Sequence, residues 1–273
     1  MRKSDCVCGG VTVKMYIVLK VLRLFNKKCA PRVSVLMPAY NCAAFIAESI
    51  ESILNQTFRD FEFIIINDGS TDATADVIRE YASRDTRIRF IDNVKNAGIV
   101  AVLNQGMDLC RGEYVARMDA DDIAAPARFM KQVAFMDAHP RCGVCGTGYQ
   151  CFGCFNDTYI RPTYVGPIDL LTGCLIGHPT AMMRRAMFNK YNLRYDPDFQ
   201  FCEDYELWSR AMRHMDLCNV PEILLRYRAH TGCVSCKNER KQKMDSLRVQ
   251  RRIIEYLSGD VENRKKLIKY FCE

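Results

Sequence analysis

The sequence predicts an α/β fold with a mainly parallel sheet that is covered by helices on both faces. Short apolar and β-branched runs alternate with segments of helical periodicity from Arg32 to about His139, and the connections between them are short. The chain has 273 residues, a length that suits one large domain with appendages better than two equal domains. Sheets of this kind bind their ligands at the carboxyl ends of the strands, so a site is expected there.

Strands are predicted where apolar runs end in polar or turn-forming residues. The four runs are "RVSVLM" (32–37), "FEFIII" (61–66), "RIRFID" (87–92) and "EYVARM" (113–118). The polar residues that follow them are Tyr40 and Asn41, then Asp68, Asn93 and the group Asp119–Asp122. Polar residues at four strand ends are typical of a binding site.

Helices are predicted between these strands from apolar residues at helical spacing. The first runs from a cap at Asn41 to Leu54. The others run from Thr71 or Asp72 to about Ser83, over 96–110, and from Pro126 in the first turn to about His139. The second half, about 141–236, mixes short strand-like runs with Gly, Pro and aromatic residues, and we expect it to be more irregular.

Charge is spread unevenly and predicts three parts of the chain. Residues 1–31 carry +6 and residues 237–273 carry +5, which leaves −4 on residues 32–236 from a total of +7. We expect a basic amphipathic N-terminal arm, one folded domain and a basic helical C-terminal tail over these ranges. An acidic body argues against nucleic acid as a partner, because a nucleic-acid groove places basic charge on the folded face. The basic ends instead favour an anionic membrane surface.

Cysteine content and hydropathy predict the compartment. Fifteen cysteines, an odd number scattered along the chain, favour reduced thiols in the cytoplasm. The longest uninterrupted apolar run in the arm is five residues, Met15–Leu19, far below the roughly 20 that span a bilayer. In the tail, Met244, Leu247, Ile254 and Leu257 form a helical stripe, which predicts a helix that packs on the body or lies on a membrane. We expect a cytoplasmic protein, peripheral at the cytoplasmic face of the membrane.

The segment "ARMDADDIAAPARF" (116–129) places Asp119, Asp121 and Asp122 within four residues, directly after a predicted strand. Like charges this close repel each other, whereas Mg²⁺ or Mn²⁺ takes one or two carboxylates together with substrate phosphates and water. An Asx turn before Pro126 is the alternative, but one Asp would suffice for it. The cluster therefore predicts a site for a metal and a diphosphate. The chain has no Walker-type phosphate loop and no GxGxxG after its first strand.

Six segments in this order and at these spacings closely resemble the family 2 glycosyltransferases, inverting enzymes with the GT-A fold. They are "VSVLMPAYN", "QTFRDFEFIIINDGSTD", "NAGIVAVLNQG", "GEYVARMDADD", "GHPTAMMRR" and "CEDYELWSRA". The resemblance covers about Arg32 to Ser235, and its specificity lies in the six segments taken together. It implies a nucleotide-sugar donor, usually a UDP-sugar, and a divalent metal, Mn²⁺ or Mg²⁺.

On the donor side, the resemblance implies that the strand ends and the loop after the third strand touch the nucleotide. The residues beside the nucleotide would be Pro38, Ala39, Tyr40 and Asn41, with Asp68 at the base. The donor-side motif adds Asn96, Gly98 and Asn104, and the nucleotide site is completed by Met118, Asp119 and Ala120. Asp119 and Asp121 would face ribose and metal. Asp122 is a second candidate metal ligand, and the resemblance does not decide between Asp121 and Asp122.

On the acceptor side, the resemblance places the general base at Asp204, beside Glu203 in "FCEDYELW". Neighbouring carboxylates at a helix start point about 100° apart, so one can face the cleft while the other caps or pairs. An acceptor hydroxyl is a poor nucleophile and needs a base to take its proton. In "YRAHTGCVS", Arg228 and His230 would reach the diphosphate or the metal, and His178 matches a family position on the acceptor side.

Two other functions fit parts of the sequence. A nucleotidyltransferase also combines an α/β sheet with a metal, but it normally needs a Gly-rich basic phosphate loop, which "MPAYNCAAF" lacks. A sugar-nucleotide-binding protein without activity would be expected to lose the base or the metal carboxylates, and this chain retains them. The four cysteines of "CGVCGTGYQCFGC" (142–154) are spaced too closely for a usual zinc site. We therefore predict a metal-dependent inverting transferase that glycosylates a hydroxyl of a glycan or lipid-linked acceptor in cell-surface polysaccharide synthesis.

Overall fold

The computed structural model describes residues 30–230, 238–259, 264–265 and 268–269. The chain separates into two compact units, Met1–Ala30 and Pro31–Glu273. The predicted N-terminal arm lies almost entirely outside the described residues, and the account below concerns the second unit. Among the residues described, no helix combines the length and the apolar character needed to cross a bilayer.

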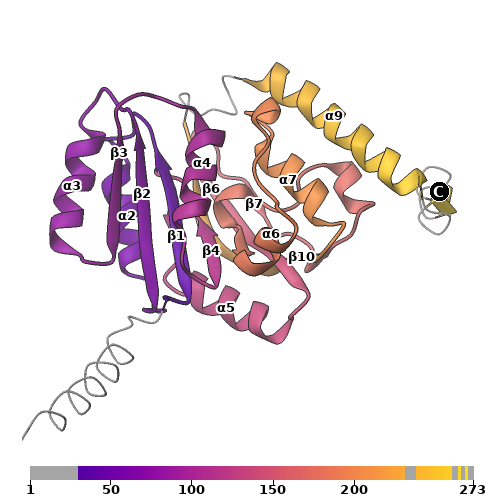
Figure 1. Ribbon diagram of the computed structural model, residues 1–273, viewed down its shortest axis with the longest axis horizontal. Coiled ribbons are helices and arrows are strands. Elements are labelled where there is room, and N and C mark those ends of the chain that lie inside the picture. Colours follow the sequence, from indigo (N-terminus) through magenta and orange to yellow (C-terminus); the bar gives the residue numbers. More distant parts are fainter. Residues whose placement is uncertain (1–29, 231–237, 260–263, 266–267, 270–273) are drawn as a thin grey trace, which may run out of the picture. The chain divides into compact units, whose positions relative to one another are not determined.

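A mixed, mostly parallel sheet of ten strands forms the centre of this unit (Figure 1). The strands are β1 (Val33–Ala39), β2 (Phe61–Asp68), β3 (Ile88–Asn93), β4 (Tyr114–Arg117), β5 (Ile123–Ala124), β6 (Cys142–Gly153), β7 (Thr158–Tyr159), β8 (Tyr164–Val165), β9 (Met182–Arg184) and β10 (Asp216–Ala229). The main order is β3-β2-β1-β4-β9-β6-β10-β5. Strands β1 to β4 pair in parallel, and so do β6 and β10, whereas β9 is antiparallel to both of its neighbours. The α/β prediction with a mainly parallel sheet is confirmed.

Helices cover the two faces of this sheet. They are α2 (Ile46–Leu54), α3 (Thr74–Arg84), α4 (Ile99–Leu109), α5 (Arg128–Ala138), α6 (Arg185–Lys190), α7 (Glu203–Ala211) and α9 (Glu239–Ser258), with single 3-10 turns at Asp169–Thr172, His178–Thr180 and Pro197–Phe199. Strand β1 shows why both faces are needed, because Val35 and Met37 join one apolar core and Leu36 joins the other. The first core contains side chains of α2, α3 and α5, and the second contains those of α4, α6, α7 and α9.

The four predicted strands lie within two residues of the observed ones, but the predicted helix starts need correction. Helix α2 begins at Ile46, and Asn41 does not cap it. The backbone of Asn41 has a left-handed φ of 47°, and its side-chain oxygen accepts the N–H of Thr71 at 2.8 Å. Helix α5 begins at Arg128, two residues after Pro126. A side chain that could cap a helix accepts a hydrogen bond from whichever N–H lies close to it in the fold. For Asn41 this is the N–H of Thr71, in the loop after β2.

The second half is more regular than expected, because β6 and β10 are long strands of 12 and 14 residues. The sequence of β6 is rich in Gly and Cys, which is not typical of a strand, yet it forms a strand that packs closely on its neighbours. At Gly146, a Cβ atom would lie 2.3 Å from the side-chain oxygen of Asn219 on β10. Only glycine allows this approach, so composition was a poor guide to structure here.

Helix α9 packs on α7, but only half of the predicted stripe faces the body. Its buried apolar residues are Val249, Ile253 and Leu257, at intervals of four. Of the predicted stripe, Leu257 is buried and Ile254 packs against the core, whereas Met244 and Leu247 are each 60% exposed. The stripe was therefore wrong at Met244 and Leu247.

Candidate active site

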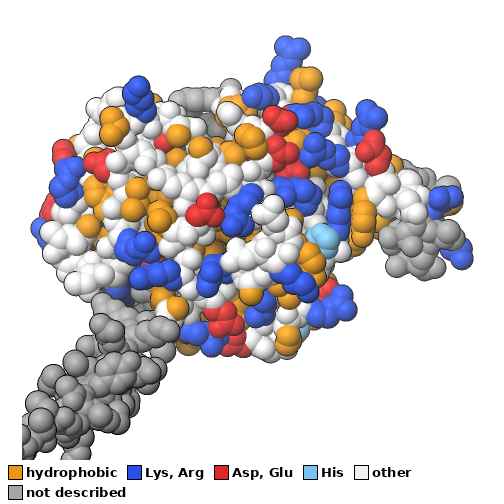
Figure 2. Space-filling model, in the orientation of Figure 1, with side chains coloured by type: hydrophobic (Ala, Val, Ile, Leu, Met, Phe, Trp, Pro, Cys, Tyr) orange, Lys and Arg blue, Asp and Glu red, His pale blue; other side chains and the backbone are white. Residues whose placement is uncertain are grey.

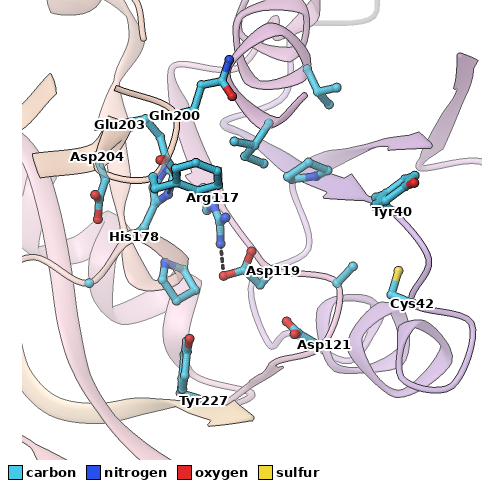
Figure 3. Close-up of a pocket in the computed structure, with 18 of the residues that line it drawn as sticks. Tyr40, Cys42, Arg117, Asp119, Asp121, His178, Gln200, Glu203, Asp204 and Tyr227 are labelled. Atoms are coloured by element: carbon cyan, nitrogen blue, oxygen red, sulfur yellow. Dashed lines mark ion pairs between the residues drawn. The ribbon is translucent and has the colours of Figure 1, made fainter. Parts of the chain in front are cut away.

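A cleft of about 710 Å³ opens at the carboxyl ends of the parallel strands (Figure 3). One side is formed by the end of β1, where Pro38, Ala39 and Tyr40 line the cleft. The residues after β4 form its floor, and the start of α7 forms the opposite side. The cleft lies where the polar residues at the strand ends predicted a site, because the carboxyl ends of parallel strands meet at one edge of a sheet.

Asp68, at the end of β2, organises the loop that follows β3. Its two carboxylate oxygens accept the backbone N–H groups of Ala97 at 2.8 Å and Gly98 at 3.0 Å. The side chain of Asn96 donates to the carbonyl of Asp68 at 3.2 Å. Gly69 has a φ of 66°, a conformation that favours glycine, and this turn brings the two loops together. Asp68, Asn96 and Gly98 all line the cleft, and their contact with the donor stays a prediction.

Three predicted donor-side residues do not line the cleft. Asn104 uses its amide to bind both backbone groups of Tyr195, each at 2.9 Å, and so ties α4 to the chain before α7. Asn41 binds the loop after β2 through Thr71, as described above. Met118 is fully buried, and its sulfur accepts a hydrogen bond from Arg128. These three residues support the cleft from behind its surface.

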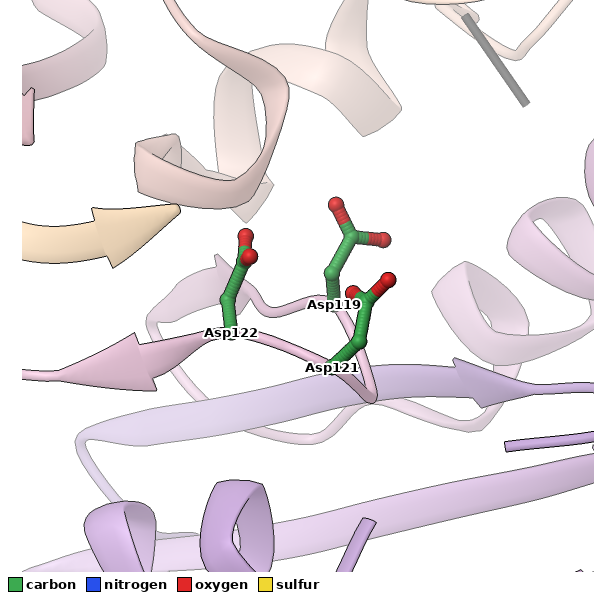
Figure 4. A group of neighbouring side chains, drawn as sticks. All are labelled: Asp119, Asp121 and Asp122. Atoms are coloured by element: carbon green, nitrogen blue, oxygen red, sulfur yellow. The ribbon is translucent and has the colours of Figure 1, made fainter. Parts of the chain in front are cut away.

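Three carboxyl groups project from the same side of the loop after β4 (Figure 4). Each of Asp119, Asp121 and Asp122 offers an oxygen within 4.8 Å of the other two. Asp121 lines the cleft and lies 3.1 Å from Nε2 of His230. Asp122 is buried outside the lining, where it accepts the backbone N–H of Arg228 at 2.8 Å. The three carboxylates therefore have unequal access to a ligand.

Burial and mutual repulsion raise the pKa values of two of these carboxyl groups. Burial is the larger cause for both Asp121 and Asp122, and the charge of Asp119 adds to it. The second oxygen of Asp122 is buried and has no hydrogen-bond partner among the described residues. A cation would relieve this crowding, because it would offset the charges that make ionisation costly.

The residues present fit a hard divalent ion. The described part of the chain contains one group of three or more His, Cys, Asp or Glu side chains with ligand spacing, and it is this Asp cluster. Carboxylate oxygens suit Mg²⁺ and Mn²⁺, and an imidazole such as that of His230 is also acceptable to Mn²⁺. Cys142 and Cys145, which belong to the sequence that resembles a zinc motif, are instead buried core residues of β6.

The opposite side of the cleft carries Glu203 and Asp204, in the first turn of α7. Asp204 accepts the N–H of Tyr205 at 2.7 Å, and the Cys174 thiol lies 3.6 Å from its other oxygen. Burial raises the pKa of Asp204 above its ordinary value. Burial also raises the pKa of Glu203, to about 7. Both groups therefore hold protons more readily than an exposed carboxylate, which suits acid–base chemistry.

With this geometry in place, comparison with known proteins decides the family. The sequence profile described as "Glycosyl transferase family 2" matches residues 34–199, more than half of the chain. The protein belongs to glycosyl transferase family 2. It is 34% identical to an uncharacterized glycosyltransferase of Haemophilus influenzae, over 83% of this chain and 74% of that protein. It is 38% identical to the putative glycosyltransferase EpsE of Bacillus subtilis, over 66% of each chain.

Solved structures confirm the GT-A fold of this family 2 glycosyltransferase. S. aureus TarS in complex with UDP-GlcNAc superposes with a TM-score of 0.66 at 20% identity, covering 74% of this chain and 60% of that one. The mannosyltransferase PcManGT of Pyrobaculum calidifontis, in complex with GDP-Man and Mn²⁺, gives a TM-score of 0.63 at 17% identity. That match covers 88% of this chain and 70% of the mannosyltransferase. At these identities the likeness concerns the fold.

Sequence reasoning missed one residue of the glycosyltransferase cleft that a simple signal could have found. Arg117 is the last residue of β4, and its side chain forms an ion pair with Asp119. Residues two apart in an extended chain point to the same side, so the spacing of Arg117 and Asp119 at the strand end was a signal that the two could meet. The polar partner of His178 was also missed, since Tyr195 meets it only through tertiary packing, at 3.0 Å.

Proposed function

We propose that this family 2 enzyme is a metal-dependent, inverting glycosyltransferase that moves a sugar from a UDP-sugar to a hydroxyl group of a glycan or lipid-linked acceptor in cell-surface polysaccharide synthesis. One observation carries the proposal: a single cleft holds Asp119 and Asp121 of the acidic cluster on its floor and the pair Glu203–Asp204 opposite. A relative named as a putative teichuronic acid biosynthesis glycosyltransferase, TuaG of Bacillus subtilis, supports the polysaccharide role, with 30% identity over 75% of this chain. The UDP-GlcNAc complex of TarS supports the choice of donor.

Asp121 and His230 are the proposed metal ligands. Asp121 lines the cleft, and His230 lies beside it, whereas Asp122 faces the backbone of Arg228. We assign Asp122 to holding Arg228 in place and Asp119, with its neighbour Ala120, to the nucleotide, while the buried Met118 supports them from behind. A bound Mn²⁺ or Mg²⁺ would offset the negative charge that develops on the departing diphosphate. Arg228, whose guanidinium donates to the carbonyl of Asp121 at 2.7 Å, adds a fixed positive charge nearby.

The nucleotide is proposed to lie against the ends of β1 and β2. Pro38, Ala39 and Tyr40 line this part of the cleft, and the ring of Tyr40 is half exposed, as a stacking surface for a base must be. Asp68 contributes by fixing the loop of Asn96 and Gly98, since both of its oxygens are already bound there.

Asp204 is the proposed general base. It lines the cleft at the start of α7, where it can accept the proton of an acceptor hydroxyl as the new bond forms. One displacement with one base, opposite the leaving diphosphate, inverts the anomeric carbon. Glu203 is assigned to holding the substrates and not to taking the proton, because its carboxylate is already engaged with His178.

We place this chemistry at the cytoplasmic face of the membrane, because the basic ends of the chain would be attracted to anionic lipid. The test is partition between anionic liposomes and buffer, with and without residues 1–28. Equal recovery of both proteins in the buffer would contradict this placement.

The proposed reaction is tested by release of UDP from a panel of UDP-sugars with Mn²⁺ or Mg²⁺. We expect slow hydrolysis of one donor, stopped by EDTA and by Asp121→Asn. Asp204→Asn should leave donor binding intact and slow transfer about 10²-fold or more. A protein that neither turns over nor binds any nucleotide-sugar in calorimetry would contradict the proposal.

A further inference from the structure

Arg117 occupies the floor of the cleft between its two groups of carboxylates. In Figure 3 its guanidinium lies between Asp119 on one side and Glu203 with His178 on the other. The side chain lines the cleft and yet is only 5% exposed. A charged group so deeply buried must be compensated, and a single carboxylate in contact, Asp119, provides that here.

The hydrogen bonding of this guanidinium is incomplete. Within the described residues, Nε and Nη1 of Arg117 are buried and have no hydrogen-bond partner, apart from the ion pair of Nη1 with Asp119. A buried donor without an acceptor lowers the stability of the fold. The position is held firmly all the same, because the backbone N–H of Arg117 binds Ala181 at 2.8 Å and its carbonyl accepts from Arg128 at 2.7 Å. A buried guanidinium that the fold holds at the wall of the cleft, with its hydrogen bonding incomplete, points to a ligand.

The proposed reaction determines which part of the substrate lies at this point. The transferred sugar must sit between the diphosphate, near Asp121, and the acceptor hydroxyl, near Asp204. Arg117 lies between these two positions, so the part of its side chain that lines the cleft faces the sugar rather than the nucleotide. Hydroxyl oxygens of a sugar are suitable acceptors for guanidinium N–H groups.

We propose that Arg117 is a specificity-determining residue of the donor site, whose guanidinium hydrogen-bonds the hydroxyl oxygens of an uncharged transferred sugar. The inference rests on the proposed function and extends it to the class of sugar. The sugar is uncharged because Asp119 and Glu203 already lie on either side of this guanidinium, so a sugar carboxylate would add a further acidic group to the same place.

The test compares UDP with UDP-sugars by calorimetry in the presence of Mn²⁺, using UDP-GlcNAc, UDP-glucose, UDP-galactose and UDP-glucuronate as probes. Arg117→Met removes the guanidinium N–H donors. Arg117→Lys keeps the positive charge but loses the planar arrangement of N–H groups. Arg184→Met is the matched control, because Arg184 is a partly buried arginine away from the cleft, bonded to Tyr114 and the Met136 carbonyl. The affinity for UDP reports whether each variant keeps its fold and its nucleotide site.

We expect Arg117→Met to weaken the preferred UDP-sugar about tenfold or more and UDP less than about threefold. The lysine variant should recover part of the loss, and the Arg184 control should change neither affinity. Equal losses for UDP and UDP-sugar would overturn the inference, since Arg117 would then act only by positioning Asp119. Tighter binding of UDP-glucuronate than of the uncharged sugars would overturn the assignment of sugar class. Wild-type protein that binds neither UDP nor a UDP-sugar would instead refute the proposed function itself.

Discussion

Nδ1 of His178 lies 3.4 Å from a carboxylate oxygen of Glu203, and Nε2 of the same ring lies 3.0 Å from the Tyr195 hydroxyl. Burial, with the charge of Arg117 second, lowers the pKa of His178 to about 3, so the ring is neutral at physiological pH. A neutral ring has one N–H. If Tyr195 donates to Nε2, the N–H on Nδ1 points to Glu203. The chain Tyr195–His178–Glu203 therefore orients a carboxyl group at the edge of the cleft.

The raised pKa of Glu203 predicts a pH-dependent stability difference between the wild type and Glu203→Gln. Burial raises the pKa of Glu203 from 4.5 to about 7, so the folded protein binds this proton more tightly than the unfolded chain does. This contribution to stability is complete below pH 4.5, is lost as the pH rises to about 7, and does not change above that. Relative to wild type, Glu203→Gln should gain up to about 3 kcal/mol of unfolding free energy between pH 4.5 and 8.

Denaturant unfolding of both proteins across this pH range measures the difference. Glu239→Gln is the control, because Glu239 is exposed. A difference that stays constant with pH for Glu203→Gln would show that Glu203 ionises normally.

Metal binding should distinguish Asp121 from Asp122. Asp121→Asn should weaken Mn²⁺ binding by about a hundredfold or more, whereas Asp122→Asn should cost about tenfold or less, as supporting residues do. The reason is that Asp121 lines the cleft beside His230 and Asp122 is turned toward the N–H of Arg228. Titration of Mn²⁺ in the presence of UDP measures both variants. The reverse order of losses would make Asp122 the direct ligand.

Two glycines in the donor-side loops should respond differently to alanine. Gly69 has a φ of 66°, and its Cβ would lie 2.7 Å from backbone atoms of Lys95 and Asn96. Gly98 has a φ of 88° but nothing within 4 Å of a Cβ. Gly98→Ala should therefore cost about 1–3 kcal/mol from backbone strain alone, and Gly69→Ala should cost more because two loops must also separate. Urea unfolding ranks the two variants, and equal costs would show that the clash is relieved without penalty.

The C-terminal helix should contribute to stability through one face only. Ile253 is fully buried against the core, so Ile253→Ala should cost about 2–5 kcal/mol. Leu247, at 60% exposure on the same helix, is the matched control, and Leu247→Ala should change stability by no more than about 0.5 kcal/mol. Chemical denaturation compares them. A small effect at Ile253 would mean that α9 is dispensable for folding of the body.

Local sequence patterns predicted the first half of the fold well, because each element there has a complete signal. Strand β2 is a continuous run of buried residues, and it was located at its true start, Phe61. Helix starts were predicted less well. Asn41 and Pro126 are residue types that often begin a helix, but here the side chain of Asn41 accepts from Thr71 and the carbonyl of Pro126 accepts from Thr57. In β6, close packing at Gly146 requires small residues, which hid the strand from propensity arguments.

The sequence alone determined the family, the strand ends and the acidic cluster, because these depend on residues that are neighbours in the chain. Tertiary structure decided which polar groups enter the cleft. Asp121 meets His230 and Asp122 meets Arg228 across more than one hundred residues, and Asn104 faces Tyr195 rather than the donor. The physical reason is that a carboxylate or an amide acquires its role from the partner that packing brings to it, and such partners leave no local pattern.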